Sequence, residues 1–220
     1  AKNAQVSQSG VGRHHLRAGL RQMAAAGVEF VNVSPVASNL ETGGPVDWIP
    51  VRPGGDTALM LALAHELHRL GAHDTAFLQR YCTGWARFEA YLTGAADGTH
   101  KTADWAAPLC AVPADRIRAL AARMVGKRVM INSAWALQRA QHGEQPFWMV
   151  VTLAAMLGQI GLPGGGFGVG YGAENMLGSP HAQLKGPSLP QGRNPVSAFI
   201  PVARIADMLL NPGAAFRYDG

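Results

Sequence analysis

The sequence predicts an α/β fold, a Rossmann-like parallel sheet with helices on both faces, over residues 1–160. Short β-branched and apolar runs alternate with helix-like segments in this part of the chain, and that order is typical of a parallel sheet covered on both faces. Each run ends at a proline, a glycine turn or a short polar loop, as strands do where they lead into helices. Residues 161–220 differ in character, and we expect a Gly/Pro-rich crossing segment followed by a terminal helix.

The first predicted elements are a helix and the strand that it leads into. Residues 14–26 are rich in Leu, Arg, Gln and Ala, and Gly27 supplies a helix stop. Residues 28–33 form a β-branched and aromatic run, which predicts a strand. Pro35 cannot donate a ladder hydrogen bond, so we expect the strand to end before it.

A second strand and a second helix follow. Residues 46–51 form an apolar run between two turns of glycine and proline, which predicts a short strand. In residues 57–70, leucines recur at spacings of four, four and three, the period of an amphipathic helix. Asp56 stands directly before this helix, and we expect it to cap the first turn.

The remaining elements are predicted from the same signals, apolar period and glycine or proline stops. They are short helices over 74–81 and 85–92, a loop over 93–102, a helix between Pro113 and Gly126, a strand over 128–134, an apolar helix over 146–157 and a closing helix over 202–210. From Gly158 to Pro195 almost no periodicity remains, and we expect an irregular segment of the kind that lines sites. The motif GVGYGA in it follows a helix rather than a strand, so a nicotinamide site is not expected.

Composition limits the class of protein. The hydrophobic content of 48% excludes a disordered chain, and two cysteines cannot staple 220 residues. Charged residues make up only 15%, against about 25% in a typical soluble domain. The net charge of +5 comes from basic residues scattered along helix faces, so we expect no nucleic-acid partner. The most apolar stretch, residues 147–162, is too short and interrupted for a membrane span, and no signal region or leader is expected at the start.

Three strand-to-helix loops carry the candidate binding residues. They are Ser34-Pro35 after the first strand, Gly54-Gly55-Asp56 after the second, and Trp135 to Arg139 after the third. Ligands of parallel α/β sheets bind beyond the carboxyl ends of the strands. We therefore expect one extended ligand to lie along that edge of the sheet.

Two of these residues have a structural and a functional interpretation. Asp56 can cap its helix, or its carboxylate can accept two hydrogen bonds from a guanine; spacing alone favours the cap. Arg139 can be a surface arginine, or its five N–H donors can hold a diphosphate or another anion.

No metal centre or nucleophile is predicted. His65 and His68 lie three residues apart on one helix and do not form an H-E-x-x-H motif, which favours a structural or surface role. Cys82 and Cys110 are isolated, without a C-x-x-C motif, and are expected to be buried thiols. No Walker loop or G-x-S-x-G elbow occurs, which disfavours phosphoryl and acyl transfer.

Four sequence segments resemble a known family. They are DWIPVRPGGDTALMLALAHEL (47–67), KTADWAA (101–107), AWALQRAQHGEQPFWMVVTLAAMLGQIGLPGGGFG (134–168) and IPVARIADML (200–209). Together they resemble the molybdenum enzymes of the dimethyl sulfoxide reductase family, in the branch of the dimethyl sulfoxide, trimethylamine N-oxide and biotin sulfoxide reductases. Members are several times longer than 220 residues, so the resemblance implies that this chain is an internal piece of a multidomain enzyme. Residues 1–160 would then be part of the dinucleotide-binding domain, and residues 161–220 the crossing segment that follows it.

The resemblance also implies which residues bind the cofactor, molybdenum bis(molybdopterin guanine dinucleotide). By position, Val33 and Ser34 match the strand end that binds the ribose in the family. Gly54, Gly55 and Asp56 match the family's guanine turn. Trp135, Ala136 and Arg139 match a loop that contacts the dinucleotide. The family usually has Asp or Asn in place of Ser34, and a larger residue in place of one of the two glycines.

The implied activity is reduction of an S-oxide or an amine N-oxide by oxygen-atom transfer. In this branch a serine upstream ligates the molybdenum, so the segment is expected to supply cofactor binding rather than the metal ligand, with the rest of the parent polypeptide as its partner. The location is cytoplasmic or periplasmic in a bacterium, and the turn GVGYGAEN favours the cytoplasmic, biotin sulfoxide type. The alternative function is a stand-alone guanine-nucleotide-binding module without metal, which would have no need of the Gly/Pro-rich tail.

Overall fold

The computed structural model describes residues 16–169, 187, 189–190 and 192–215. The chain divides into two compact units, Ala1–Gln183 and Leu184–Gly220. The first unit contains all the described strands and most of the described helices, and the second unit contains one short helical segment. The predicted boundary between residues 160 and 161 stays a prediction.

The first sheet consists of two parallel strands, β1 (Phe30–Val33) and β2 (Val46–Ile49). Phe30 pairs with Val46 and Val33 pairs with Ile49, so the carboxyl ends of both strands lie at one edge. Both strands were predicted, and each is shorter than its apolar run. The pairing is parallel because the connection from β1 to β2, which contains the short helix η1 (Ala37–Asn39), returns to the end of the sheet where β1 begins.

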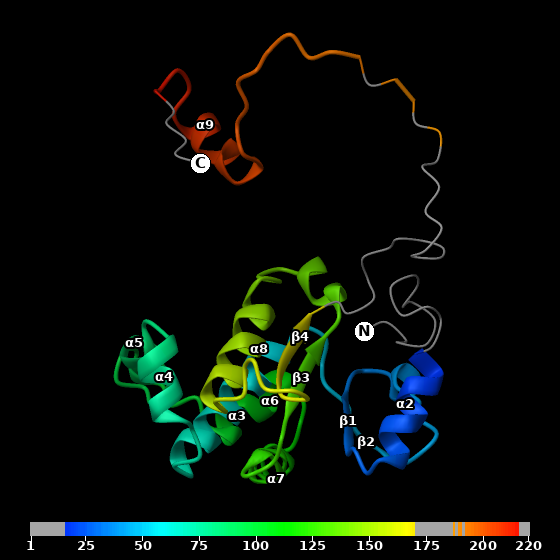
Figure 1. Cartoon of the computed structure of the whole chain (residues 1–220). Helices are drawn as coiled ribbons and strands as arrows, with labels where there is room; N and C mark the ends of the chain where they lie inside the picture. The colour runs from blue at the N-terminus through cyan, green and yellow to red at the C-terminus, as the bar shows by residue number, and fades with distance from the viewer. Residues whose placement is uncertain (1–15, 170–186, 188, 191, 216–220) are drawn as a thin grey trace. The chain divides into compact units, whose positions relative to one another are not determined.

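The second sheet pairs β3 (Met130–Ser133) with β4 (Gly166–Val169), again in parallel (Figure 1). The prediction of an irregular segment from residue 158 onward was wrong here. Two of the four residues of β4 are glycine, a poor strand former, and its pairing with β3 supplies the order that local propensity lacks. The α/β class and the parallel pairing are confirmed, but the described strands form two sheets of two rather than one continuous sheet.

The predicted helices are found close to their expected bounds, and one helix was missed. Those expected are α2 (Leu16–Ala25), α3 (Asp56–Arg69), α4 (Thr75–Tyr81), α5 (Trp85–Leu92), α7 (Ala114–Met124), α8 (Gln145–Met156), and η3 (Val202–Arg204) continuing into α9 (Ile205–Leu210). The missed helix is α6 (Ala103–Cys110), which carries Pro108 and is capped by the Thr102 side chain accepting from the Trp105 amide at 3.1 Å. Its short length and internal proline concealed the helical period.

The hydrophobic core lies around α3, which packs against α6, α7 and α8. Leu59, Leu63 and Leu67 of α3 are at most 5% exposed. Ile49 at the end of β2 and Val51 just after it belong to the same core, so the strand end that precedes the candidate glycine turn is anchored in it. No helix among the described residues is long and apolar enough to cross a membrane.

Candidate functional site

The loop after β1 is held by hydrogen bonds around Ser34, which is 1% exposed. Its amide donates to the Ile49 carbonyl at 3.2 Å, and its carbonyl accepts from Trp48 Nε1 at 2.8 Å. The Ser34 hydroxyl oxygen accepts from the Val36 amide at 3.2 Å and from Asn39 Nδ2. Both lone pairs of that oxygen are therefore used, and the hydroxyl proton is what Ser34 can offer a ligand.

Asn32 shapes the same loop and is not among the residues predicted from the sequence. The Asn32 side chain is 7% exposed, and its Nδ2 donates to the carbonyls of Val36 and Ala37 at 3.3 and 2.9 Å. An amide with two donors at a strand end is a signal for such a turn. Val33, which precedes Ser34, is 38% exposed and is the last residue of β1, at the carboxyl end of the sheet.

The glycine turn after β2 is fixed to the end of α6. The Arg52 amide donates to the Cys110 carbonyl at 2.8 Å, and the Gly55 amide donates to the Arg52 carbonyl at 2.8 Å. A Cβ atom on Gly55 would lie 2.6 Å from Cys110 Cα, so this position needs glycine for packing. Gly54 needs glycine for another reason, since its φ is +84° and open space surrounds it.

Asp56 does not cap α3, so the prediction of a capping side chain was wrong. The helix begins at Asp56 itself, its N-cap residue is Gly55, and no side chain accepts a capping hydrogen bond. Burial raises the pKa of Asp56, and the backbone N–H groups of Asp56 and Gly54 lower it in part. The carboxylate thus stands half-buried at a helix N-terminus, where negative charge is favoured, beside backbone N–H groups of the same turn.

The third loop follows β3 and forms the short helix η2 (Trp135–Arg139). Trp135 is 36% exposed and Ala136 is half-buried. Arg139 is exposed and forms no ion pair or hydrogen bond with another residue of the described part of the chain. Gly143 closes the loop, because a Cβ atom there would lie 2.5 Å from the Gln138 carbonyl oxygen. The sequence analysis did not single out this glycine.

The structure brings the first two loops together and leaves the third in the other sheet. Ser34 and Ile49 are hydrogen-bonded across the ends of β1 and β2, and the glycine turn continues from the latter strand. The Trp135–Arg139 loop extends from β3, which pairs with β4. That all three loops face one ligand stays a prediction. Gly170 and Gly172 of the motif GVGYGA lie outside the described residues.

These loops carry groups that suit a polar, anionic ligand with a flat ring. Asp56 supplies a carboxylate acceptor, Gly54 an open backbone, Arg139 an exposed guanidinium and Trp135 a half-exposed ring. A carboxylate at a backbone turn suits a ring edge with adjacent N–H donors, and a guanidinium suits phosphate oxygens.

The other residues weighed in the sequence have structural surroundings. Burial lowers the pKa of His65, whose ring contacts His100 edge-on at 6.3 Å between centroids. His68 pairs with Glu89 rather than with His65. Cys110 is a buried free thiol as predicted, and Cys82 is a half-buried free thiol.

A family model for molybdopterin oxidoreductases matches residues 3–216 of the chain. Biotin sulfoxide reductase of Cereibacter sphaeroides is 47% identical over the whole chain, and dimethyl sulfoxide/trimethylamine N-oxide reductase of the same organism is 44% identical over 94% of it. Trimethylamine-N-oxide reductase of Haemophilus influenzae is 44% identical over 91% of the chain.

The chain spans 29%, 26% and 26% of the lengths of these three relatives. Among solved structures, it is similar to acetylene hydratase from Pelobacter acetylenicus over 47% of this chain and 13% of that one, with a TM-score of 0.40 and 20% identity. The family match covers nearly the whole chain and the relatives exceed 40% identity, so the chain belongs to the molybdopterin oxidoreductase family.

Proposed function

We propose that this chain binds the guanine nucleotide ends of molybdenum bis(molybdopterin guanine dinucleotide) in an enzyme that reduces an S-oxide or an amine N-oxide. Membership of the molybdopterin oxidoreductase family supports the cofactor class. The names of the relatives, biotin sulfoxide reductase and dimethyl sulfoxide/trimethylamine N-oxide reductase, support the substrate class. The observation that carries the proposal is the half-buried Asp56 carboxylate at the N-terminus of α3, whose pKa is raised by burial.

Asp56 fits the guanine. Burial raises the pKa of this carboxyl, so the fold bears a cost for its ionised form that a hydrogen-bonding ligand would offset. A guanine presents N1–H and an exocyclic amine side by side, and both oxygens of one carboxylate can accept from them. Gly54 places open backbone rather than a side chain where the ring would lie, Gly55 packs the turn on α6, and Val33 and Ser34 stand at the adjacent strand end, where the ribose would bind.

Arg139 fits the diphosphate. Its guanidinium forms no ion pair in the described part of the chain, and arginine binds phosphate oxygens through paired N–H donors. Trp135 and Ala136 belong to the same loop, and Gly143 allows the backbone of that loop to close. When bound, the cofactor supplies the two-electron chemistry of oxygen-atom transfer. The role of these residues is to bind and orient it.

The rest of the parent polypeptide is the proposed partner of this chain. Apolar side chains remain on the surface of the first unit, among them Trp148 of α8 at 69% exposed and Tyr81 of α4 at 64%. The chain spans 29% of the length of a relative, and we propose that these exposed aromatic groups contact the remaining polypeptide. We also propose a cytoplasmic location, which rests on the similarity to biotin sulfoxide reductase; the turn GVGYGAEN that favours it lies largely outside the described residues. Cell fractionation tests the location.

The experiment measures molybdenum and GMP in the purified full-length protein. Acid hydrolysis releases the nucleotide, and we expect about two GMP per molybdenum because each of the two dinucleotides carries one guanine. Asp56→Asn keeps the shape of the side chain and removes its charge, and we expect at least a tenfold loss of bound GMP and molybdenum. Asp115→Asn is the matched control, since Asp115 is an exposed first-turn acid of α7.

Two results would overturn the proposal. One is the absence of both molybdenum and GMP from the wild-type protein. The other is equal retention by Asp56→Asn and Asp115→Asn, which would remove Asp56 from the site. GMP bound without molybdenum would support the alternative, a guanine-nucleotide-binding module without metal.

A further inference from the structure

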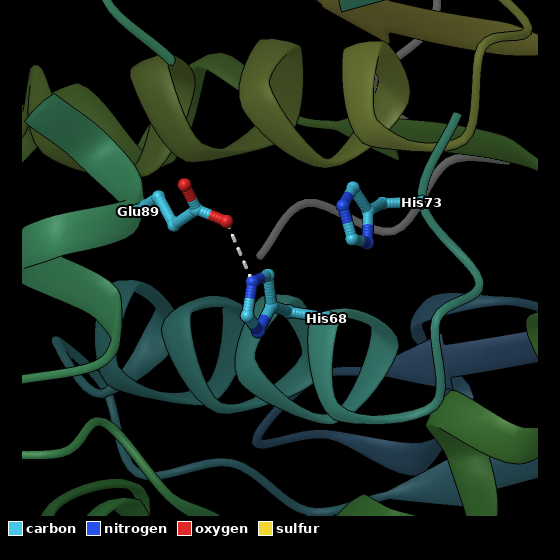
Figure 2. Close-up of side chains that lie close together, drawn as sticks. All are labelled: His68, His73 and Glu89. Carbon is cyan, nitrogen blue, oxygen red and sulfur yellow. Dashed lines mark hydrogen bonds and ion pairs between the residues drawn. The ribbon is translucent and has the colours of Figure 1, made fainter. Parts of the chain in front are cut away.

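Three metal-ligand side chains converge near the carboxyl end of α3, the helix that begins at Asp56. His68 lies in the last turn of α3, His73 lies in the loop that leads to α4, and Glu89 lies in α5. Figure 2 shows the three side chains pointing toward one another. One ligand atom of each lies within 4.8 Å of the other two, and His68 Nε2 lies 2.8 Å from Glu89 Oε1.

We propose that His68, His73 and Glu89 bind a divalent transition-metal ion of the Zn²⁺ type. Two imidazole nitrogens and one carboxylate oxygen form a donor set that zinc uses, with a fourth position open to water. With metal–ligand bonds of about 2.0–2.1 Å, tetrahedral geometry places ligand atoms about 3.3 Å apart. The ligand atoms of the three side chains all lie within 4.8 Å of one another, so side-chain rotations, which include turning the His73 ring out of its stack on His68, bring the three to that spacing around one ion.

The surroundings leave these ligands available. His73 forms no hydrogen bond with another residue of the described chain, and its Nδ1 is buried without a partner. Its ring is held by stacking instead, at 5.0 Å between centroids from His68 and 5.3 Å from Trp85. The side chains of His68 and Glu89 are 26% and 39% exposed, so an ion can enter from solvent.

The ion would tie α5 to α3. Without it, the hydrogen bond between His68 and Glu89 joins these helices across a half-exposed surface. A metal that binds all three residues would also fix the loop that carries His73, and metal binding to a site formed only in the folded state adds to folding stability. The proposed role is therefore a structural staple, independent of the guanine nucleotide site.

The test uses the full-length protein without an affinity tag, stripped of loosely bound metal by a chelator. Zn²⁺ is titrated in competition with a chromophoric chelator, and the bound ion is examined by X-ray absorption at the zinc edge. We compare His68→Gln and Glu89→Gln with the control His100→Gln, an exposed histidine outside the cluster. We expect the first two variants to bind Zn²⁺ at least tenfold more weakly at this site, and to lose the rise in Tm that Zn²⁺ gives the wild type and the control.

Several outcomes would reject the metal site. One is equal binding of Zn²⁺ by the variants and the control, and another is an absorption edge that lacks imidazole scattering. A third is that His68→Gln lowers the Tm by the same amount with and without Zn²⁺, which would make the residue pair a plain helix–helix bridge. Circular dichroism confirms that each variant is folded, and GMP content reports separately on the nucleotide site.

Discussion

At the residue scale, Asp56 combines a structural cost with the binding role that we propose for it. Burial raises the pKa of this carboxyl in the folded protein above its value in the unfolded chain. The folded state then holds the proton more tightly. The contribution of the protonated Asp56 carboxyl to folding stability is therefore complete below the pKa that Asp56 has in the unfolded chain, and it is lost as pH rises through the pKa in the folded protein. At neutral pH the ionised side chain opposes folding of the cofactor-free protein.

We therefore predict that Asp56→Asn raises the stability of the cofactor-free protein at pH 7. The amide keeps the acceptor oxygen for the backbone N–H groups and removes the buried charge. The gain should shrink as pH falls toward about 4, where the unfolded aspartate also becomes protonated. Urea unfolding of both proteins between pH 4 and pH 7 measures the difference. A difference that stays constant over this range, or a loss at pH 7, would contradict the prediction.

At the scale of elements, the sequence was informative wherever an element carries its own period. The leucine spacing of α3 and the glycine stop after α7 located both helices within one or two residues. The strand β4 and the helix α6 carry no such signal, because glycines interrupt one and Pro108 the other. Both are stabilised by tertiary contacts instead: β4 pairs with β3, and α6 packs against the turn at Gly55.

The contact of that turn with α6 leads to a prediction for Gly55→Ala. The backbone of Gly55 has φ −86°, which any residue adopts, so only steric overlap opposes the new methyl group. That group would lie 2.6 Å from Cys110 Cα and 3.0 Å from the Arg52 carbonyl oxygen. Overpacking of this kind costs about 1–3 kcal/mol, and we expect a loss in that range by chemical denaturation.

Gly19→Ala is the matched control for Gly55→Ala. Gly19 lies inside α2, and nothing stands within 4 Å of the position that its Cβ would take. Replacing a helical glycine by alanine stabilises by about 0.5–1 kcal/mol. The two substitutions should therefore change the free energy of unfolding with opposite signs. The same sign for both would show that the turn does not pack closely on α6.

At the scale of the whole molecule, the candidate site was predictable loop by loop but not as one surface. The rule that ligands bind beyond strand ends selected the loops after β1, β2 and β3. It did not reveal that these strands belong to two sheets, because the pairing partner of a strand depends on contacts far along the chain. Arg52 and Gly143 hold the loops in shape through backbone groups, and Asn32 does so through side-chain hydrogen bonds to backbone carbonyls; the sequence does not show which backbone groups these residues meet.

Charged side chains attach the first sheet to the helical core of the first unit. Asp47 of β2 accepts hydrogen bonds from Arg116 and Arg123 of α7. Glu29, just before β1, pairs with Arg123 at 3.2 Å and with Lys127. The sheet that carries Ser34 is therefore held to α7 at its amino end, while the apolar contacts of Ile49 and Val51 hold its carboxyl end.

We predict that Asp47→Asn destabilises the protein by about 1 kcal/mol at low salt, because one carboxylate serves two arginines at a partly buried position. The loss should decrease in 1 M NaCl, where the Debye length falls to about 3 Å. Asp104→Asn is the control, since Asp104 pairs with Arg118 alone and its side chain is 71% exposed. We expect that control to change stability by less than about 0.5 kcal/mol. Chemical denaturation at both salt concentrations measures the four values, and equal losses for the two variants would show that the network does not attach the sheet to α7.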